Sequence, residues 1–185
     1  TSYPGNFSVR NVYSANGRLC QVRPADGSNN CSAEGYYWKL SHQDVNGNNE
    51  HIMLSDGAIQ VVRRHDSFNQ DLKEIKSGRM LGSDIQDMEY RWDQVGNLVH
   101  RSDRIQNVQE NFLYDDLNRL VRVFGSSESV DLGYDAIGNI VNKSDVGSYE
   151  YHSNSPHRLI SVSGQRPARF FYDANGSQIS SLQGR

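Results

Sequence analysis

The sequence predicts an all-β protein of tandem antiparallel β-hairpins that together form a curved sheet. Three observations predict it. One short phrase recurs about every twenty residues, the residues before it alternate between apolar and polar, and each copy holds the residue types of a tight turn. The 16 glycines and 4 prolines among 185 residues fit a chain with many tight turns. No useful length of helical periodicity competes with this pattern.

The phrase consists of an aromatic residue, Asp, two spacers, Gly or Asn, a polar residue and an aliphatic residue. Its clearest copies begin at Trp92, Tyr114, Tyr134 and Tyr172. With the weaker copies included, the eight anchors fall at positions 13, 43, 65, 92, 114, 134, 151 and 172. Because each hairpin leans on its neighbours to bury its apolar face, we expect residues 1–185 to form a single repeat region.

Each residue type in the phrase has a physical reason. Tyr90 and Trp92 alternate with polar neighbours, which is the period of a half-buried strand. The carboxylate of Asp93 can then accept hydrogen bonds from backbone amides two or three residues ahead, and Gly96 can adopt the positive φ that closes the loop. Asn118 fills the glycine position in another copy, since Asn tolerates positive φ.

We therefore assign the recurring residues to a turn rather than to a chemical site. They are Tyr13, Gly17, Asp44, Gly47, Asp66, Trp92, Asp93, Gly96, Tyr114, Asp115, Asn118, Tyr134, Asp135, Gly138, Tyr172, Asp173 and Gly176. In the first copy Ser14 replaces Asp as the cap. Residues that recur in every unit are expected to serve the unit's own structure. The sequence predicts no catalytic residue, no cofactor site and no metal site.

Charge and hydropathy exclude two classes of partner. The net charge is −3 and no basic run exceeds three residues, so nothing favours nucleic acid binding. The longest apolar runs are far too short to cross a bilayer. The chain begins Thr1-Ser2-Tyr3 and shows no signal peptide, from which we expect a fragment of a larger protein.

The two cysteines, Cys20 and Cys31, are eleven positions apart. A disulfide between neighbouring strands would form in an oxidising compartment, whereas two unpaired thiols are the alternative. The sequence leaves both open. Residues 24–30 are expected to form a long polar loop rather than a domain linker.

Other groups of residues give weaker evidence for a metal or catalytic site. Asp44 opens a stretch that imitates a calcium loop, but an EF-hand needs Gly and Glu where this chain has Asn49 and Ser55. The repeated aspartates are expected to accept hydrogen bonds from their own turns. Gly-x-Ser-x-Gly is absent, and we expect no enzyme. The six histidines are dispersed, and none is expected to pair closely with a cysteine or a carboxylate: they lie at positions 42, 51, 65, 100, 152 and 157.

The tandem phrase Tyr-Asp-x-x-Gly-Asn/Arg-Leu resembles that of the YD-repeat, or Rhs-repeat, family over nearly the whole chain. Residues 90–98 and 114–120 carry the phrase, and the connecting segment 142–151 fits the same order. The family includes bacterial Rhs polymorphic toxins, the C component of insecticidal toxin complexes and the teneurins. The resemblance implies a spiralling β-sheet that closes into a hollow cocoon around a toxin or another domain.

What the resemblance implies is a non-catalytic shell module, secreted or at the cell surface. Its partners would be other repeats of the parent chain and an enclosed toxin or effector polypeptide. The Asp-Pro motif that ends bacterial shells is absent, and eight repeats are not expected to close a cocoon. The alternative is an extracellular module whose repeated aromatic turns bind carbohydrate or a partner protein.

Overall fold

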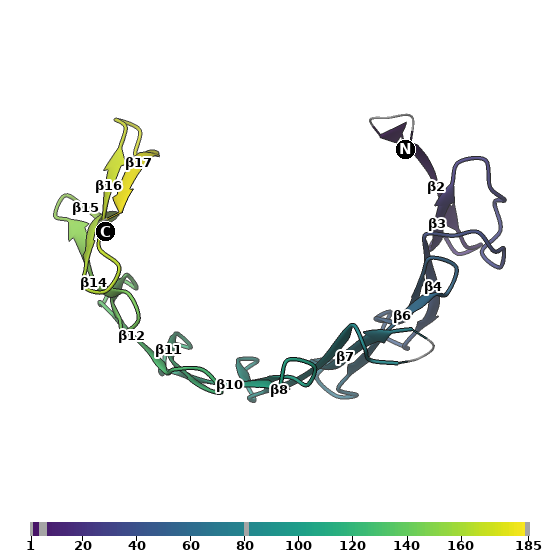
Figure 1. The fold of residues 1–185 in the computed structure, drawn as a ribbon, viewed down its shortest axis with the longest axis horizontal. Coiled ribbons are helices and arrows are strands. Elements are labelled where there is room, and N and C mark those ends of the chain that lie inside the picture. Colours follow the sequence, from purple (N-terminus) through teal and green to yellow (C-terminus); the bar gives the residue numbers. More distant parts are fainter. Residues whose placement is uncertain (1, 4–6, 80–81, 184–185) are drawn as a thin grey trace. The chain divides into compact units, whose positions relative to one another are not determined.

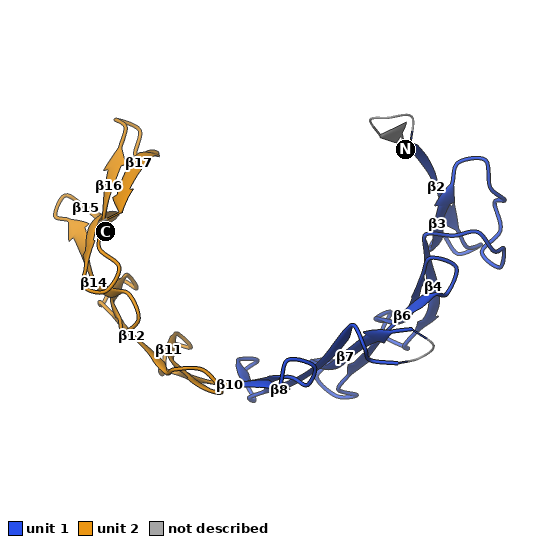
Figure 2. Cartoon of the chain, viewed as in Figure 1, with its two compact units in different colours: residues 1–109 blue, residues 110–185 orange. Residues whose placement is uncertain are grey.

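The computed structural model describes residues 2–3, 7–79 and 82–183, and these residues contain seventeen β-strands and no helix (Figure 1). The prediction of an all-β chain of antiparallel hairpins is confirmed. The described residues accordingly include no helix that could span a membrane. The chain divides into two compact units, residues 1–109 and residues 110–185 (Figure 2). That one repeat region spans both units stays a prediction.

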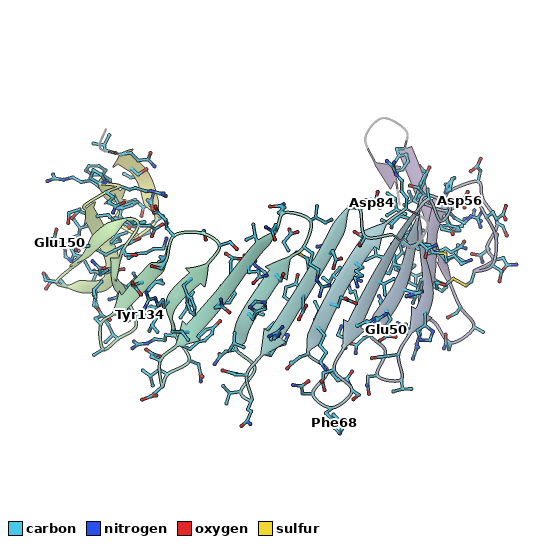
Figure 3. All side chains as sticks on the ribbon, turned by 60° about the horizontal axis from the view of Figure 1, so that its bottom comes forward. Glu50, Asp56, Phe68, Asp84, Tyr134 and Glu150 are labelled. Atoms are coloured by element: carbon cyan, nitrogen blue, oxygen red, sulfur yellow. A yellow bond between two sulfur atoms is a disulfide. The ribbon has the colours of Figure 1, made fainter. Side chains whose placement is uncertain are left out.

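The strands of unit 1 run in chain order. They are β1 (Ser2–Tyr3), β2 (Phe7–Tyr13), β3 (Leu19–Pro24), β4 (Trp38–Gln43), β5 (Asn49–Leu54), β6 (Ile59–His65), β7 (Leu72–Gly78), β8 (Gln86–Trp92) and β9 (Leu98–Asp103). Each pairs antiparallel with the next, so the sheet order of this unit is the chain order. Figure 3 shows β4–β9 side by side in one layer.

Unit 2 repeats the same meander. Apart from the first two residues of β10, it contains β10 (Val108–Tyr114), β11 (Leu120–Gly125), β12 (Val130–Tyr134), β13 (Ile140–Lys143), β14 (Gly147–His152), β15 (Ser155–Ser163), β16 (Ala168–Tyr172) and β17 (Gln178–Gln183). Consecutive strands again pair antiparallel.

The anchors of the sequence phrase mark strand ends. Seven of the eight even-numbered strands end at an anchor position, and β14 ends one residue after position 151. The pairing register also shifts next to each of these ends, for example between Arg91 and Trp92 and between Gly133 and Tyr134. Such a shift is the signature of a bulge, which places an extra residue on one strand and increases the local twist.

The two faces of the unit 1 sheet differ in chemistry. Ile52 and Val61 are paired on one face, and Ile75 is paired with Met88 on the same face. The opposite face carries charged rows. Glu74 lies there, with Lys76 Nζ at 2.6 Å and Arg64 Nε at 3.5 Å from its carboxylate. Side chains of successive residues point to opposite faces of a strand, so the alternation in the sequence produces this division.

Unit 1 also contains a second layer. Residues 25–37 fold back over β3, and the Cys20–Cys31 disulfide holds them there. Nε2 of the fully buried Gln21 donates to the carbonyls of Cys31 and Ala33, both at 2.8 Å. The sequence left the state of the cysteines open, and in the structure they are paired.

Candidate functional site

The turn after β8 shows how one copy of the phrase folds. The Asp93 amide donates to the Asn97 carbonyl at 2.9 Å, and the Gly96 amide donates to the Asp93 carbonyl at 3.3 Å. Gly96 has a φ of 90°, which costs a residue without a Cβ nothing. This is a type I turn followed by a glycine bulge, a standard way to close a short hairpin loop.

The carboxylate of Asp93 is occupied by its own turn. Oδ1 accepts from the amides of Val95 at 3.0 Å and Asn97 at 2.8 Å, and Oδ2 accepts from Asn97 Nδ2 at 2.9 Å. The bond from the Asn97 amide, with those of its side chain and of Val95, holds the pKa of Asp93 below its ordinary value. The ionised side chain therefore acts as a cap.

Four other copies repeat this geometry. In the turns of Asp44, Asp115, Asp135 and Asp173, Oδ1 accepts from the amides two and four residues ahead at 2.8 to 3.0 Å. The third residue after each Asp has a positive φ: Gly47, Asn118, Gly138 and Gly176.

The pKa values of three of these carboxyls are lowered for related reasons. The Asn48 side chain lowers the pKa of Asp44, and the Arg119 guanidinium lowers that of Asp115. Around Asp135 burial acts to raise the pKa, but the combined hydrogen bonds of the turn outweigh it and the pKa is lowered. These aspartates remain ionised and bound to their turns.

The remaining copies vary the cap. The Asp66 loop is one residue longer and closes with Gln70 at a φ of 65°, while Lys73 Nζ lies 2.6 Å from Oδ2 and lowers the Asp66 pKa. Phe68 stands at the tip of this loop, 95% exposed (Figure 3). In the first copy Ser14 Oγ accepts from the Arg18 amide at 3.3 Å, and the Gly17 amide donates to the Ser14 carbonyl.

The aromatic residue of the phrase connects one hairpin to the preceding one. Trp92 Nε1 donates to the Leu72 carbonyl at 2.7 Å, and the Tyr134 hydroxyl donates to the Leu120 carbonyl at 2.8 Å. Leu72 and Leu120 are the first residues of β7 and β11, each directly after the preceding turn. Tyr151 does the same to the first residue of β13, at 3.0 Å. We call this contact the aromatic staple.

The other predicted aromatics lie at strand ends with different surroundings. Tyr13 ends β2 and is 56% exposed. Tyr114 ends β10 and is half-buried. Tyr172 ends β16, with the Arg158 guanidinium 5.7 Å from its ring centroid.

One functional position was missed in the sequence. The side chain of the fourth residue after Asp donates to the carboxylate and also to a group in the next hairpin. Asn48 Nδ2 donates to Asp44 Oδ2 and to Gln70 Oε1, both at 2.8 Å, and Asn139 Nδ2 donates to Asp135 Oδ2 and to the Pro156 carbonyl, also at 2.8 Å. The recurring Asn or Arg after the glycine position was the available signal.

Arginine fills the same position with the same geometry. Arg119 Nε donates to Asp115 Oδ2 at 2.7 Å, and its Nη1 donates to the Asp135 carbonyl at 3.1 Å. Its guanidinium also lies 4.7 Å from the Tyr134 ring centroid, a cation–π contact. In each unit, the residue in the fourth position after Asp therefore links one hairpin to the next by a hydrogen bond.

The structure corrects the expectation that no histidine lies near a carboxylate. His42 Nε2 is 3.7 Å from Glu50 Oε2, and His65 lies close to Asp44 and Glu50. The expectation was wrong because the β4–β5 hairpin and the end of β6 bring residues from separate copies of the phrase together. Within the described ranges, Asp44, Glu50 and His65 are the one group of three side chains that could share a metal ion.

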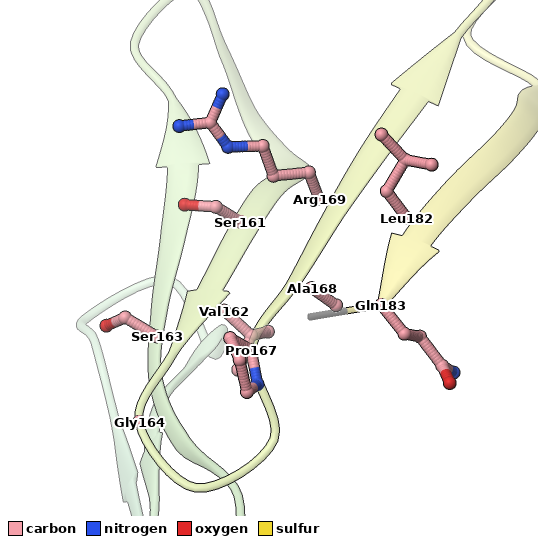
Figure 4. A pocket seen from close by; sticks show the side chains of 9 residues that line it. All are labelled: Ser161, Val162, Ser163, Gly164, Pro167, Ala168, Arg169, Leu182 and Gln183. Atoms are coloured by element: carbon pink, nitrogen blue, oxygen red, sulfur yellow. The ribbon is translucent and has the colours of Figure 1, made fainter. Parts of the chain in front are cut away.

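A cavity in unit 2 offers little chemistry. It has a volume of about 460 Å³, lies beside β15, β16 and β17 and includes Val162, Pro167 and Leu182 in its wall (Figure 4). Its lining contains Arg169 but no carboxylate, histidine or cysteine. That lining does not hold a general acid–base pair or a metal.

Comparison with known proteins identifies the fold. No protein-family model matches the chain, and no curated protein matches it. The crystal structure of TcdB2-TccC3-Cdc42 superposes on 96% of this chain with a TM-score of 0.68 and 16% identity.

Two related structures align with lower scores. TcdB2-TccC3 without its hypervariable C-terminal region has a TM-score of 0.44 at 14% identity, covering 99% of this chain and 14% of that chain. The Photorhabdus luminescens Tc holotoxin pore with the mutation TccC3-D651A has a TM-score of 0.38 at 11% identity, covering 97% and 13%. TM-scores of 0.44 and 0.38 do not establish a shared fold. The chain spans a tenth of the length of the TcdB2-TccC3-Cdc42 chain, and it shares the fold of that segment.

Proposed function

We propose that the chain is a non-catalytic wall segment of an Rhs-type β-shell. In the parent protein, the wall would enclose or present a toxin or another polypeptide. The aromatic staple carries the proposal. Trp92, Tyr134 and Tyr151 use their polar atoms to bind the preceding hairpin, and the turn aspartates use theirs to bind their own loops. The polar atoms of these recurring residues thus serve to extend the sheet and close its turns.

The uncovered apolar face supports the same proposal. Apolar side chains on the shared face of β4–β8 are only half-buried, among them Trp38, Leu40, Leu54, Ile59, Val61, Ile75, Met88 and Tyr90. A sheet with one apolar face is stable when a second layer covers that face. Further repeats of the parent chain, or the enclosed polypeptide, would supply the layer.

The fold similarity is consistent with this role. The TcdB2-TccC3-Cdc42 chain is about ten times longer than the stretch that this chain matches, as expected for one segment of a long wall. By analogy with the Rhs family that the repeated phrase resembles, the parent of this chain would be a bacterial protein that acts outside the cell, secreted or at the cell surface.

Protease protection in the full-length parent protein tests the proposal. We expect the polypeptide beyond the repeats to resist a protease that digests it rapidly once the protein is unfolded. Trp92→Ala removes one aromatic staple and should increase the rate at which the polypeptide beyond the repeats is digested. Phe68→Ala, at an exposed loop tip, should leave that rate unchanged. Rapid digestion of that polypeptide in the folded wild type would refute enclosure.

A second candidate function is carbohydrate binding. A groove of about 180 Å³ in unit 1 combines aromatic and polar side chains, as sugar sites do. Its lining is Asp66, Asn69, Asp71, Lys73, Tyr90, Arg91 and Trp92. Calorimetry with a panel of oligosaccharides should detect binding that Arg91→Ala weakens and Arg122→Ala does not. If no oligosaccharide gave a heat of binding, carbohydrate binding would be ruled out as a function of this groove.

A further inference from the structure

Asp44, Glu50 and His65 converge beside the second turn. Asp44 caps the loop between β4 and β5, Glu50 is the second residue of β5, and His65 is the last residue of β6. One ligand atom from each of the three lies within 4.8 Å of the other two, and all three side chains are half-buried. They come from two consecutive copies of the phrase.

His65 stands at an aromatic anchor position without forming an aromatic staple. At this position Trp92 donates to the carbonyl of the first residue of β7, and Tyr134 donates to that of β11. In the part of the chain that the structure describes, Nδ1 of His65 is buried and has no hydrogen-bond partner. A buried polar atom without a partner calls for an explanation, and an absent ion is one of the usual ones.

The surrounding charge suits a dication. The Asn46 and Asn48 amides donate to Oδ1 of Asp44, and the Asn48 side chain donates to its Oδ2. Each carboxylate oxygen can accept more than one bond, so Asp44 can cap its turn and still offer a lone pair. With Glu50, two carboxylates face the imidazole of His65.

The ligand types select the metal. A histidine nitrogen with two carboxylate oxygens suits Zn²⁺ and similar transition-metal ions, whereas Ca²⁺ and Mg²⁺ prefer oxygen alone. Zinc bonds to these atoms are about 2.1 Å long and point to the corners of a tetrahedron, so two donors on one ion lie about 3.4 Å apart. The three ligand atoms, now within 4.8 Å of one another, would have to move closer together to bind one ion. The two cysteines cannot compete, because they are joined in a disulfide.

We propose that Asp44, Glu50 and His65 bind one divalent transition-metal ion, for which Zn²⁺ is the test ligand. The ion would tie the β4–β5 hairpin to β6. At this copy of the phrase the ion would link two neighbouring hairpins, as the aromatic staple of Trp92 does at its own copy. The site would strengthen the sheet at one point and would add no chemistry.

Calorimetric titration of the purified chain with ZnCl₂ tests the proposal. We expect one equivalent to bind with a micromolar or lower Kd, and His65→Gln to weaken binding at least tenfold. Glu50→Gln should weaken it similarly and serves as the second variant if His65→Gln does not fold. Circular dichroism in EDTA establishes that each variant is folded. Zn²⁺ should also raise the melting temperature of the wild type more than that of His65→Gln.

Matched controls locate the ion. Asp93→Asn alters the same kind of turn at a place without a histidine ligand, and His100→Gln removes a histidine elsewhere; both should bind Zn²⁺ as the wild type does. Undiminished binding by folded His65→Gln would overturn the proposal. So would loss of binding on His42→Gln with full binding by His65→Gln, since the ion would then lie on the other side of Glu50. No binding by the folded wild type would also overturn it.

Discussion

The stretch from β2 to β5 and the β16–β17 hairpin are made of the same phrase, yet only the first has a core. Val9, Val12, Cys20, Tyr36 and Ile52 are buried in the first. In the second, every residue of β17 is exposed, with Ile179 at 66% and Leu182 at 64%. Part of the difference is the loop 25–37, which the disulfide holds against the face of β3 that carries Gln21, the residue paired with Val12.

This contrast shows how a single-layer repeat sheet is stabilised. The hairpins supply turns and strand pairing throughout, and the covering loop adds burial beside β3, at Val12 and Gln21. Val12 is fully buried because it sits in the part of the sheet that the loop covers. A wall of such hairpins should therefore depend heavily on polar turn contacts, and more so than a two-layer domain of the same size.

Acid should have the largest effect, through turns in both units of the chain. The folded-state pKa values of Asp44, Asp66, Asp93, Asp115 and Asp135 all lie below the ordinary value of 3.8. Their hydrogen bonds stabilise the fold fully above that value, and the stabilisation is lost as the pH falls through the folded pKa values. Urea midpoints followed by circular dichroism from about pH 7 to about pH 2.5 should fall steeply in the acid range. A flat profile would contradict the capping role.

Reduction of the disulfide should affect only the first region. Opening the loop closed by Cys20 and Cys31, eleven residues apart, should cost about 3 kcal/mol of unfolding free energy. Hydrogen exchange should become faster for the amides of residues 7–37 and stay unchanged for residues 168–183. Equal acceleration in both segments would show that the loop stabilises more than its own neighbourhood. A Cys20→Ser, Cys31→Ser double variant without reductant is the control.

Loss of one staple should be smaller. Tyr134→Phe removes the hydroxyl that donates to the Leu120 carbonyl and should destabilise the protein by about 1 kcal/mol in urea unfolding. Tyr13→Phe, at an exposed strand end, is the matched change and should have little effect. Equal losses in the two variants would mean that the hydroxyl bond to the preceding hairpin contributes nothing.

The smallest effect is expected in β17. Ile179→Ser places a polar side chain on an exposed position and should change the unfolding free energy by less than about 0.5 kcal/mol. Val12→Ala, at a fully buried site, should cost about 2 kcal/mol in the same assay. If the two losses were similar, the hairpin β16–β17 would be covered in solution.

Most of the fold could be predicted from the sequence because the repeat couples local and global structure. Alternation before Trp92 and turn residues after it define the same hairpin, so strand ends fall at the anchors. The sequence could not show that the loop 25–37 folds back, since its contacts run from polar side chains such as Gln21 to backbone carbonyls. It also missed Asn48 and Asn139, whose second bonds reach a turn that lies about twenty residues further along the chain.

His65 was misjudged for a related reason. Linear spacing separates it from Asp44 by about twenty residues, and only the pairing of β5 with β6 brings it beside Glu50. Contacts between copies depend on register, which a single sequence fixes only approximately.

The reach of Asn48, Arg119 and Asn139 from one turn to the next has a consequence for how such walls change in length. Each contact is made by one phrase on its immediate neighbour, and the accepting group is a side-chain oxygen in one copy and a backbone carbonyl in the others. Duplication of a gene segment encoding one phrase would therefore insert a hairpin whose two borders are already compatible. Deletion of one would rejoin its neighbours without creating an unpaired turn. Parent proteins of different sizes could arise by this route alone, with no residue outside the duplicated segment changed.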